Sequence, residues 1–129
     1  MFDGRALLPA AAGLALVAAL LAPASAFARA APDALPEIAT AALPKEAREV
    51  LLLIRAGGPF PHERDGVAFG NRERLLPAQP RGYYHEYRVP TPGAKNRGAR
   101  RIVCGGPRQA PVACWYTADH YQSFARIRE

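Results

Sequence analysis

A change in hydrophobic spacing at Gly57 and Gly58 constrains the fold of this chain more than any other feature. Before it, residues 44–56 (PKEAREVLLLIRA) carry apolar side chains at helical spacing. The residues on the apolar face are Ala47, Val50, Leu51 and Ile54. Pro44 suits the first turn of a helix, and the two glycines suit its end. We therefore predict one amphipathic helix that packs on another element.

After Gly58 the chain consists of short β-branched and aromatic runs separated by Pro, Gly, Asn and Asp, which is typical of antiparallel strands. The expected strands are residues 67–69, 83–89, 100–104, 113–117 and 122–127. One helix followed by about five strands predicts an α+β fold. The helix would cover one face of an antiparallel sheet and leave the other face free for a ligand.

The first thirty residues are predicted to be an export signal. Arg5 precedes an apolar run over residues 6–21, and small residues suitable for cleavage follow at 24–26 and 28–30. A transmembrane anchor is the alternative, but the run is short, rich in Ala and interrupted by Pro and Gly. We therefore expect a secreted protein with no membrane attachment after cleavage.

Cleavage near residue 26 or 30 would leave about 100 residues, which is enough for one small domain. Residues 31–42 contain two prolines and little periodicity, so we expect a flexible leader there. The folded domain is expected over residues 43–129. From residue 31 onward there are 15 Lys and Arg against 10 Asp and Glu, a net charge of +5. Such a domain attracts polyanions, although many exported proteins are basic for solubility alone.

The two cysteines, Cys104 and Cys114, are predicted to form a disulfide, because an exported protein meets an oxidising compartment. They lie at the end of one expected strand and the start of the next, where facing positions come within disulfide reach. A metal site is not expected, since the three histidines, His62, His85 and His120, are scattered along the chain without ligand spacing.

Three segments outside the helix carry side chains suited to acid–base chemistry or anion binding. In the strand 83–89, alternation puts Tyr84, Glu86 and Arg88 on one face, which makes a poor core and favours a wet functional surface. The alternatives for Glu86 are a solvated charge or a cross-strand ion pair with Arg101.

The other two segments lie further along the chain. Residues 95–101 (KNRGARR) place Arg97 and Arg101 on one side, where planar guanidinium groups can hold a phosphate. The alternative is a basic surface loop, which is what we expect of Arg100. His120 sits in a turn between two expected strands and can exchange a proton near neutral pH, although a lone His is more often structural or merely exposed.

Four motifs in order resemble the microbial guanyl-specific ribonucleases, the family of barnase and ribonuclease Sa. The resemblance covers about residues 43–128, and the motifs are LPKEAREVLLLI, GGPFPHERDGVAFGNRERLLP, RGYYHEYRVPTPGAKNRGARRIV and YTADHYQSFARIR. It implies cleavage of single-stranded RNA after G, through a 2′,3′-cyclic phosphate that is then hydrolysed, without a cofactor. Such cleavage needs a base for the 2′-hydroxyl, an acid for the leaving oxygen and cations around the phosphate.

The resemblance assigns a role to each candidate. Glu86 matches the general base and His120 the general acid. Arg97 and Arg101 match the arginines that hold and stabilise the phosphate. The guanine-binding residues would be Phe69, Asn71, Arg72, Glu73 and Tyr121. Here the carboxylate of Glu73 would accept hydrogen bonds that adenine cannot donate. The alternative for Glu73 is a plain exposed carboxylate between two arginines.

Two departures from the family pattern are visible. Gly70 stands where a member of the family carries a side-chain amide, which would loosen the guanine loop. A family member joins its chain ends by a disulfide, whereas this chain can pair only Cys104 with Cys114. The family also implies a monomer and, in some relatives, an acidic barstar-like inhibitor. A non-catalytic RNA-binding module and an antibacterial toxin are the alternative functions.

Overall fold

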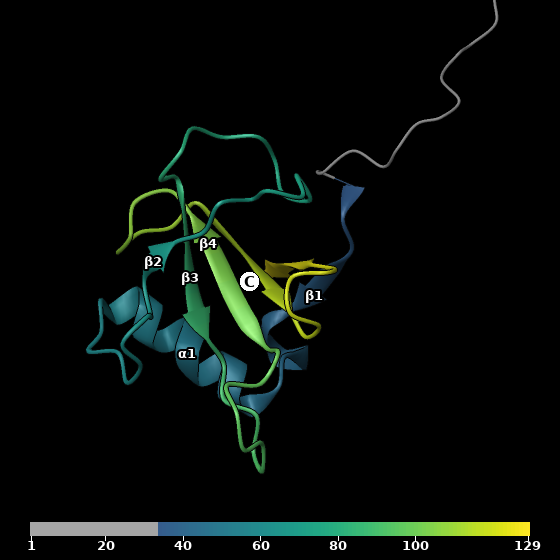
Figure 1. Ribbon diagram of the computed structural model, residues 1–129. Helices are drawn as coiled ribbons and strands as arrows, with labels where there is room; N and C mark the ends of the chain where they lie inside the picture. Colours follow the sequence, from purple (N-terminus) through teal and green to yellow (C-terminus); the bar gives the residue numbers. More distant parts are fainter. Residues whose placement is uncertain (1–33) are drawn as a thin grey trace, which may run out of the picture.

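The computed structural model describes residues 34–129, which form one α-helix beside a six-stranded sheet (Figure 1). The predicted export signal lies outside the described residues. In chain order the elements are β1 (Glu37–Ala39), a 3-10 helix (Thr40–Ala42), α1 (Lys45–Ala56), β2 (Val67–Ala68), β3 (Tyr84–Arg88), β4 (Arg101–Gly105), β5 (Ala113–Thr117) and β6 (Ala125–Arg128). The strand order across the sheet is β1-β6-β5-β4-β3-β2. No helix among residues 34–129 has the length and apolar character needed to cross a membrane.

Helix α1 forms where the apolar spacing predicts it. Pro44 caps its N-terminus, and Gly57 ends it in the left-handed conformation at φ 82°, where the missing Cβ removes the steric penalty. The four predicted apolar residues are all buried: Ala47, Val50, Leu51 and Ile54. They pack against one face of the sheet in a core that includes Tyr87, Ile102 and Tyr116. The prediction of an amphipathic helix on a sheet is confirmed.

The opposite face of the sheet carries a second, smaller core, which corrects the sequence prediction for that face. Tyr84 is only 3% exposed and packs there with Val103, Trp115, Phe124 and Leu76. The chain between β2 and β3 supplies Leu76 and covers this end of the sheet. Strand alternation alone could not show that a loop covers part of this face. The part around Glu86 lines a cavity.

The sheet is mixed, and not purely antiparallel with about five strands as expected. Strand β1 pairs in parallel with β6, with Ile38 opposite Ile127. This places residues 37–42, expected to belong to a flexible leader, in regular structure at the edge of the sheet. Ile38 packs against the helix-side core, which accounts for the ordering of a three-residue strand. Such a short strand shows no alternation that a sequence pattern could reveal.

The last strand starts later than predicted because a side chain competes for its first N–H groups. The Asp119 carboxylate accepts hydrogen bonds from the backbone N–H groups of Gln122 at 3.1 Å and Ser123 at 2.9 Å. These residues therefore belong to a turn, and β6 begins at Ala125. The other four predicted strands differ from the observed ranges by at most one residue at either end.

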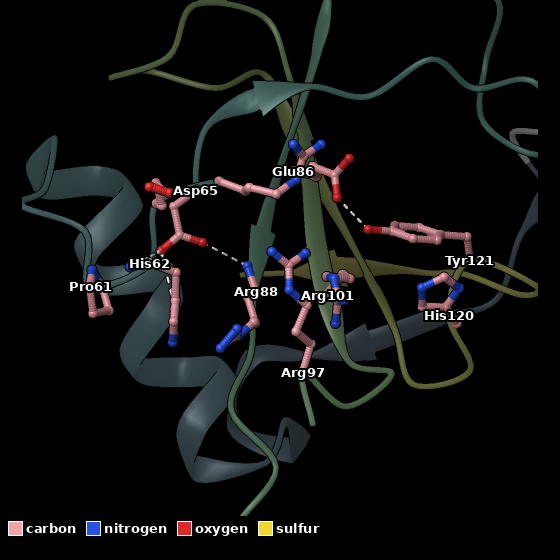
Figure 2. A pocket seen from close by; sticks show the side chains of 11 residues that line it. Pro61, His62, Asp65, Glu86, Arg88, Arg97, Arg101, His120 and Tyr121 are labelled. Carbon is pink, nitrogen blue, oxygen red and sulfur yellow. Dashed lines mark hydrogen bonds and ion pairs between the residues drawn. The ribbon is translucent and has the colours of Figure 1, made fainter. Parts of the chain in front are cut away.

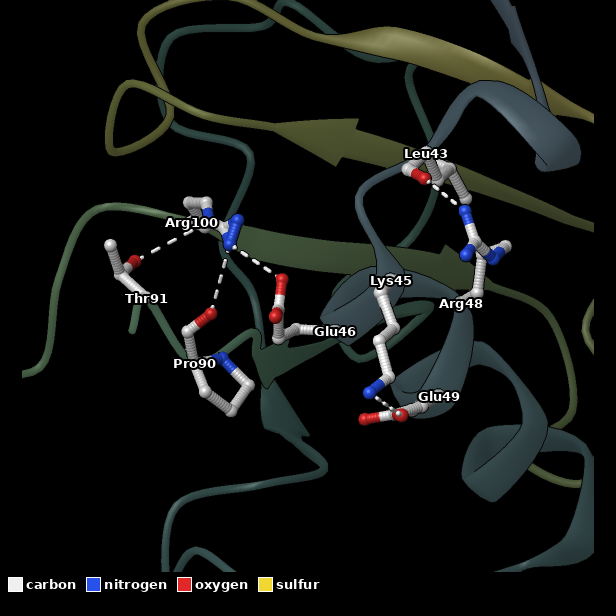
Figure 3. A network of polar contacts seen from close by, with 8 residues as sticks. All are labelled: Leu43, Lys45, Glu46, Arg48, Glu49, Pro90, Thr91 and Arg100. Carbon is white, nitrogen blue, oxygen red and sulfur yellow. Dashed lines mark hydrogen bonds and ion pairs between the residues drawn. The ribbon is translucent and has the colours of Figure 1, made fainter. Parts of the chain in front are cut away.

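Arg100 is part of a structural network on the helix side of the sheet, and not the solvated residue expected (Figure 3). Its guanidinium donates to Glu46 of α1 at 3.1 Å, to the Pro90 carbonyl at 3.0 Å and to the Thr91 hydroxyl at 3.4 Å. The Arg100 side chain is 15% exposed, so this ion pair is more shielded than a typical surface pair. It links α1 to the loop between β3 and β4.

The predicted disulfide is present. Cys104 of β4 and Cys114 of β5 are direct partners across the antiparallel pair, and both side chains belong to the helix-side core. The bond fixes the pairing of two central strands at the base of their connecting loop.

Replacing both cysteines with Ala should lower the free energy of unfolding by about 3 kcal/mol, as the chain-entropy model gives for so short a loop. Urea unfolding of the two proteins measures the difference. The transition midpoint should fall, and the slope should rise slightly, because the unfolded chain exposes more surface without the cross-link. Equal midpoints would show that the bond contributes nothing to stability.

Candidate active site

A cavity of about 480 Å³ opens on the face of the sheet that α1 leaves free (Figure 2). The sheet contributes Glu86 and Arg88 from β3 and Arg101 from β4, and Arg97 comes from the loop between these strands. Further lining residues are Pro61, His62, Glu63, Arg64, Asp65, His120 and Tyr121. We call this the first cavity. It brings together all four residues predicted to be catalytic: Glu86, Arg97, Arg101 and His120.

Glu86 occupies the middle of β3, where its neighbours in the sheet are Val67 and Val103. Its side chain accepts a hydrogen bond from the Tyr121 hydroxyl. Among the described residues no ion pair joins it to Arg101, so that alternative does not hold. Burial, together with this hydrogen bond and the Glu86 charge, raises the pKa of Tyr121 to about 12. The phenol is therefore a permanent donor to the carboxylate at neutral pH.

The turn between β5 and β6 holds His120 in an unusual backbone conformation. His120 and Tyr121 both have positive φ, 58° and 73°, which is uncommon for residues with side chains. Hydrogen bonds compensate: the His120 N–H donates to the Ala99 carbonyl at 2.9 Å, and the Tyr121 N–H donates to the Thr117 hydroxyl oxygen at 3.1 Å. These bonds fix the backbone of the turn from which the His120 side chain reaches the first cavity.

Asp119 organises this turn from within. Its Oδ1 accepts from the Thr117 hydroxyl at 2.8 Å, and its Oδ2 accepts from the Ser123 hydroxyl. The hydrogen bond from the Ser123 side chain is the main cause that lowers the pKa of Asp119 below its usual value. The ionised Asp119 carboxylate therefore stabilises the turn that contains His120.

Arg101 is a buried cation, 6% exposed, at the base of the first cavity. Its guanidinium donates to the carbonyls of Gly98 at 3.1 Å and Arg100 at 2.8 Å, and it lies 5.8 Å from the centre of the Tyr121 ring. No carboxylate of the described residues forms an ion pair with it. A buried guanidinium without a carboxylate partner among the described residues is suited to bind an anion.

A second cavity of about 260 Å³ adjoins the first. Its lining includes every residue predicted to bind guanine: Phe69, Asn71, Arg72, Glu73 and Tyr121. Leu75 and Phe124 also line it and were not predicted, because their apolar character indicated only core packing. The Phe69 and Tyr121 rings stack at 5.2 Å between centroids and wall the cavity.

The loop that forms the second cavity is shaped by Asn71. Its side chain donates to the Leu76 carbonyl at 3.0 Å and accepts from the Leu76 N–H at 3.1 Å. The residue itself adopts a positive φ of 51°, which Asn tolerates better than most side chains. Glu73 is exposed at the rim. A Cβ at Gly70 would make only ordinary contacts with Arg72, so this position does not require a glycine.

Residues 61–65 and Arg88 line the first cavity but were not predicted as site residues. Asp65, whose side chain is 3% exposed, fixes this segment to β3. Its Oδ1 accepts from the Arg88 backbone N–H at 2.9 Å and its Oδ2 from the His62 backbone N–H at 3.0 Å. The contact with Arg88 joins segments 23 residues apart, so the local spacing of residues could not predict it. Within the described residues there is no cluster of His, Cys, Asp and Glu that could hold a metal ion.

Fold and site together define a small α+β protein with two adjoining cavities. One is lined by Glu86, His120 and arginines, and the other is walled by the aromatic rings of Phe69 and Tyr121. The family model for ribonuclease matches residues 28–128, and the chain belongs to this family. It is 58% identical over 86 residues to guanyl-specific ribonuclease Sa3 of Kitasatospora aureofaciens, covering 67% of this chain and 59% of that protein. It is 52% identical over 90 residues to guanyl-specific ribonuclease Sa of the same organism, covering 70% and 91%.

Solved structures agree with these relatives. A structure of ribonuclease Sa2 described as complexes with mononucleotides aligns with a TM-score of 0.69 at 43% identity, covering 74% of this chain and 95% of that chain. Ribonuclease Sa2 with 3′-GMP aligns with a TM-score of 0.65 at 42% identity, covering 73% and 97%. The chain spans about three fifths of the length of the Sa3 relative and most of the others.

The Tyr121 hydroxyl should contribute stability in a pH-dependent way. A pKa raised from 10 to about 12 by folding means that its contribution is complete below pH 10 and is lost as the pH rises towards 12. Tyr121→Phe should therefore lower the free energy of unfolding at pH 8 and have a smaller effect at pH 11. Urea unfolding of both proteins at several pH values measures this. A difference that does not change with pH would contradict the raised pKa of Tyr121.

Proposed function

We propose that this protein is a guanyl-specific endoribonuclease that cleaves single-stranded RNA on the 3′ side of guanosine. One observation carries the proposal: the first cavity brings together Glu86, His120 and the two arginines Arg97 and Arg101. Tyr121 is shared with a second cavity lined by Phe69 and Glu73. A base bound in the second cavity would bring its own 3′-phosphate into the first. The relatives named guanyl-specific ribonucleases support the same activity.

In the first step, Glu86 accepts the proton of the 2′-hydroxyl, whose oxygen attacks the adjacent phosphorus. The bond from phosphorus to the 5′-oxygen of the next nucleotide breaks, and His120 protonates this leaving oxygen. The product is a 2′,3′-cyclic phosphate. In the second step a water molecule opens the ring to a 3′-phosphate, with His120 as base and Glu86 as acid. The 2′-hydroxyl nucleophile restricts the reaction to RNA.

Arg97 and Arg101 stabilise the phosphate as it gains charge during each step. Arg101 is buried and held in place by two carbonyls, so its position is set before the substrate arrives. Arg97 is exposed in its loop and lines the same cavity. Placing donors where charge develops lowers the barrier, because no reorganisation is needed at the moment of reaction.

Guanine selection rests on the second cavity. The carboxylate of Glu73 would accept hydrogen bonds from N1–H and the 2-amino group, which adenine lacks. Backbone N–H groups near Asn71 and Arg72 would donate to O6, since the Asn71 side chain is engaged with Leu76. The Tyr121 and Phe69 rings offer apolar surface for the base.

Cleavage of GpC against ApC, with EDTA present, tests the proposal. Wild-type protein should release a cyclic phosphate from GpC, and His120→Ala should lower kcat/KM by about 100-fold or more. His85→Ala is the matched control. His85 is the cross-strand partner of Cys104, whose side chain faces α1, and it does not line either cavity. Its rate should stay close to that of the wild type.

Glu86→Gln tests the general base in the same assay. Its rate should fall, and the decline of the wild-type rate at acidic pH should disappear. An unchanged rate and pH profile would remove Glu86 from the mechanism. Tight RNA binding without cleavage of GpC by the wild-type protein would replace this proposal with a non-catalytic RNA-binding module.

Glu73→Gln should reduce the preference for GpC over ApC by about tenfold or more, because the amide presents a donor where guanine also presents donors. The ratio of the two kcat/KM values measures this. Glu49→Gln, on the exposed side of α1, is the matched control and should keep the wild-type ratio. A ratio unaffected by Glu73→Gln would assign guanine selection to the backbone groups alone.

A further inference from the structure

Arg88 and Arg101 face each other across the two central strands of the site. They are direct partners in the antiparallel pairing of β3 with β4, and both line the first cavity. Like charges directly opposite each other on one face of a sheet destabilise it. A neighbouring carboxylate or a bound anion would remove this repulsion between the two guanidinium groups.

No carboxylate in the described part of the chain neutralises this pair. The ion pairs formed by residues 34–129 include neither guanidinium. Asp65 is the carboxylate joined to Arg88, but both its oxygens bind backbone N–H groups, of Arg88 and of His62. Glu86 accepts its hydrogen bond from Tyr121. Two of the three carboxylates in the cavity lining therefore already accept hydrogen bonds from other groups.

The first cavity as a whole carries an excess of positive charge. Its lining contains four arginines, Arg64, Arg88, Arg97 and Arg101, together with His120. Against them stand three carboxylates, Glu63, Asp65 and Glu86. An anion bound among the arginines would be attracted to each of them, and this attraction would offset their mutual repulsion.

The position of Arg88 along β3 indicates where such an anion would lie. Arg88 follows Glu86 by two residues on the same face of the strand. The other end of β3, at Tyr84, adjoins the second cavity, because the Phe69 N–H donates to the Tyr84 carbonyl at 2.9 Å. Arg88 thus flanks Glu86 on the side away from the proposed guanine cavity, next to Arg101.

We propose that Arg88 is a further phosphate-binding residue, which forms with Arg101 a two-guanidinium site for the RNA phosphate held beside Glu86. This rests on the proposed function for the identity of the phosphate as the one that is cleaved. Arg88, Arg97 and Arg101 all line the first cavity, so Arg88 would add a third guanidinium to the two already assigned to the phosphate. The binding chemistry itself requires only a phosphate group, whether inorganic or part of RNA.

Thermal unfolding in inorganic phosphate tests the site without any cleavage reaction. The Tm of the wild-type protein should be higher in phosphate than in chloride of equal ionic strength, because an anion bound only by the folded state stabilises it. Arg88→Gln should show a clearly smaller rise. Arg81→Gln removes the same charge at an exposed position outside both cavities, and should respond as the wild type does. An equal rise in all three proteins would overturn the proposal.

Cleavage of GpC distinguishes the RNA phosphate from inorganic phosphate. Arg88→Gln should lower kcat/KM by about tenfold, as expected for the loss of one charged hydrogen bond to the phosphate, and Arg81→Gln should not. A full rate for Arg88→Gln would limit the site to inorganic phosphate and overturn its role in RNA binding. If the wild type cleaves no GpC, the proposed function fails, while the Tm comparison still decides whether the two arginines bind phosphate.

Discussion

The pairing of β3 with β4 determines where every other part of the site can lie. Its register sets Glu86 opposite Val103 and Arg88 opposite Arg101. Side chains alternate between the faces of a strand, so a slip of one residue would turn these charges into the core beneath α1. Tyr87 and Ile102, partners in the same register, bury their side chains in that core. The apolar pattern on one face thus fixes the polar pattern on the other.

The site contains features that oppose folding, and the helix side of the sheet compensates for them. His120 and Tyr121 occupy strained backbone conformations, and Arg101 is a buried cation without a carboxylate partner among the described residues. On the opposite face, α1 buries a continuous apolar stripe and the disulfide joins β4 to β5. Stability and chemistry are therefore divided between the two faces of one sheet, which allows each to be adjusted with little effect on the other.

Local patterns in the sequence predicted the elements whose causes are local. The helix followed from apolar spacing, and the disulfide pairing from the positions of Cys104 and Cys114 beside consecutive strands. The candidate residues of both cavities came from resemblance to a family, and the structure brings them together. What escaped prediction depends on contacts between distant segments. Strand β1 is ordered by β6, nearly ninety residues away, and Asp65 reaches Arg88 across a loop. The spacing of residues along the chain cannot predict such contacts.

Tyr121 lines both cavities, and its hydroxyl binds Glu86 while its ring stacks on Phe69. Tyr121 therefore connects the wall of the second cavity to the environment of the Glu86 carboxylate in the first. A substitution at Tyr121 would change the lining of both cavities at once. A side chain at Gly70, where a Cβ would make only ordinary contacts, would change the lining of the second cavity alone.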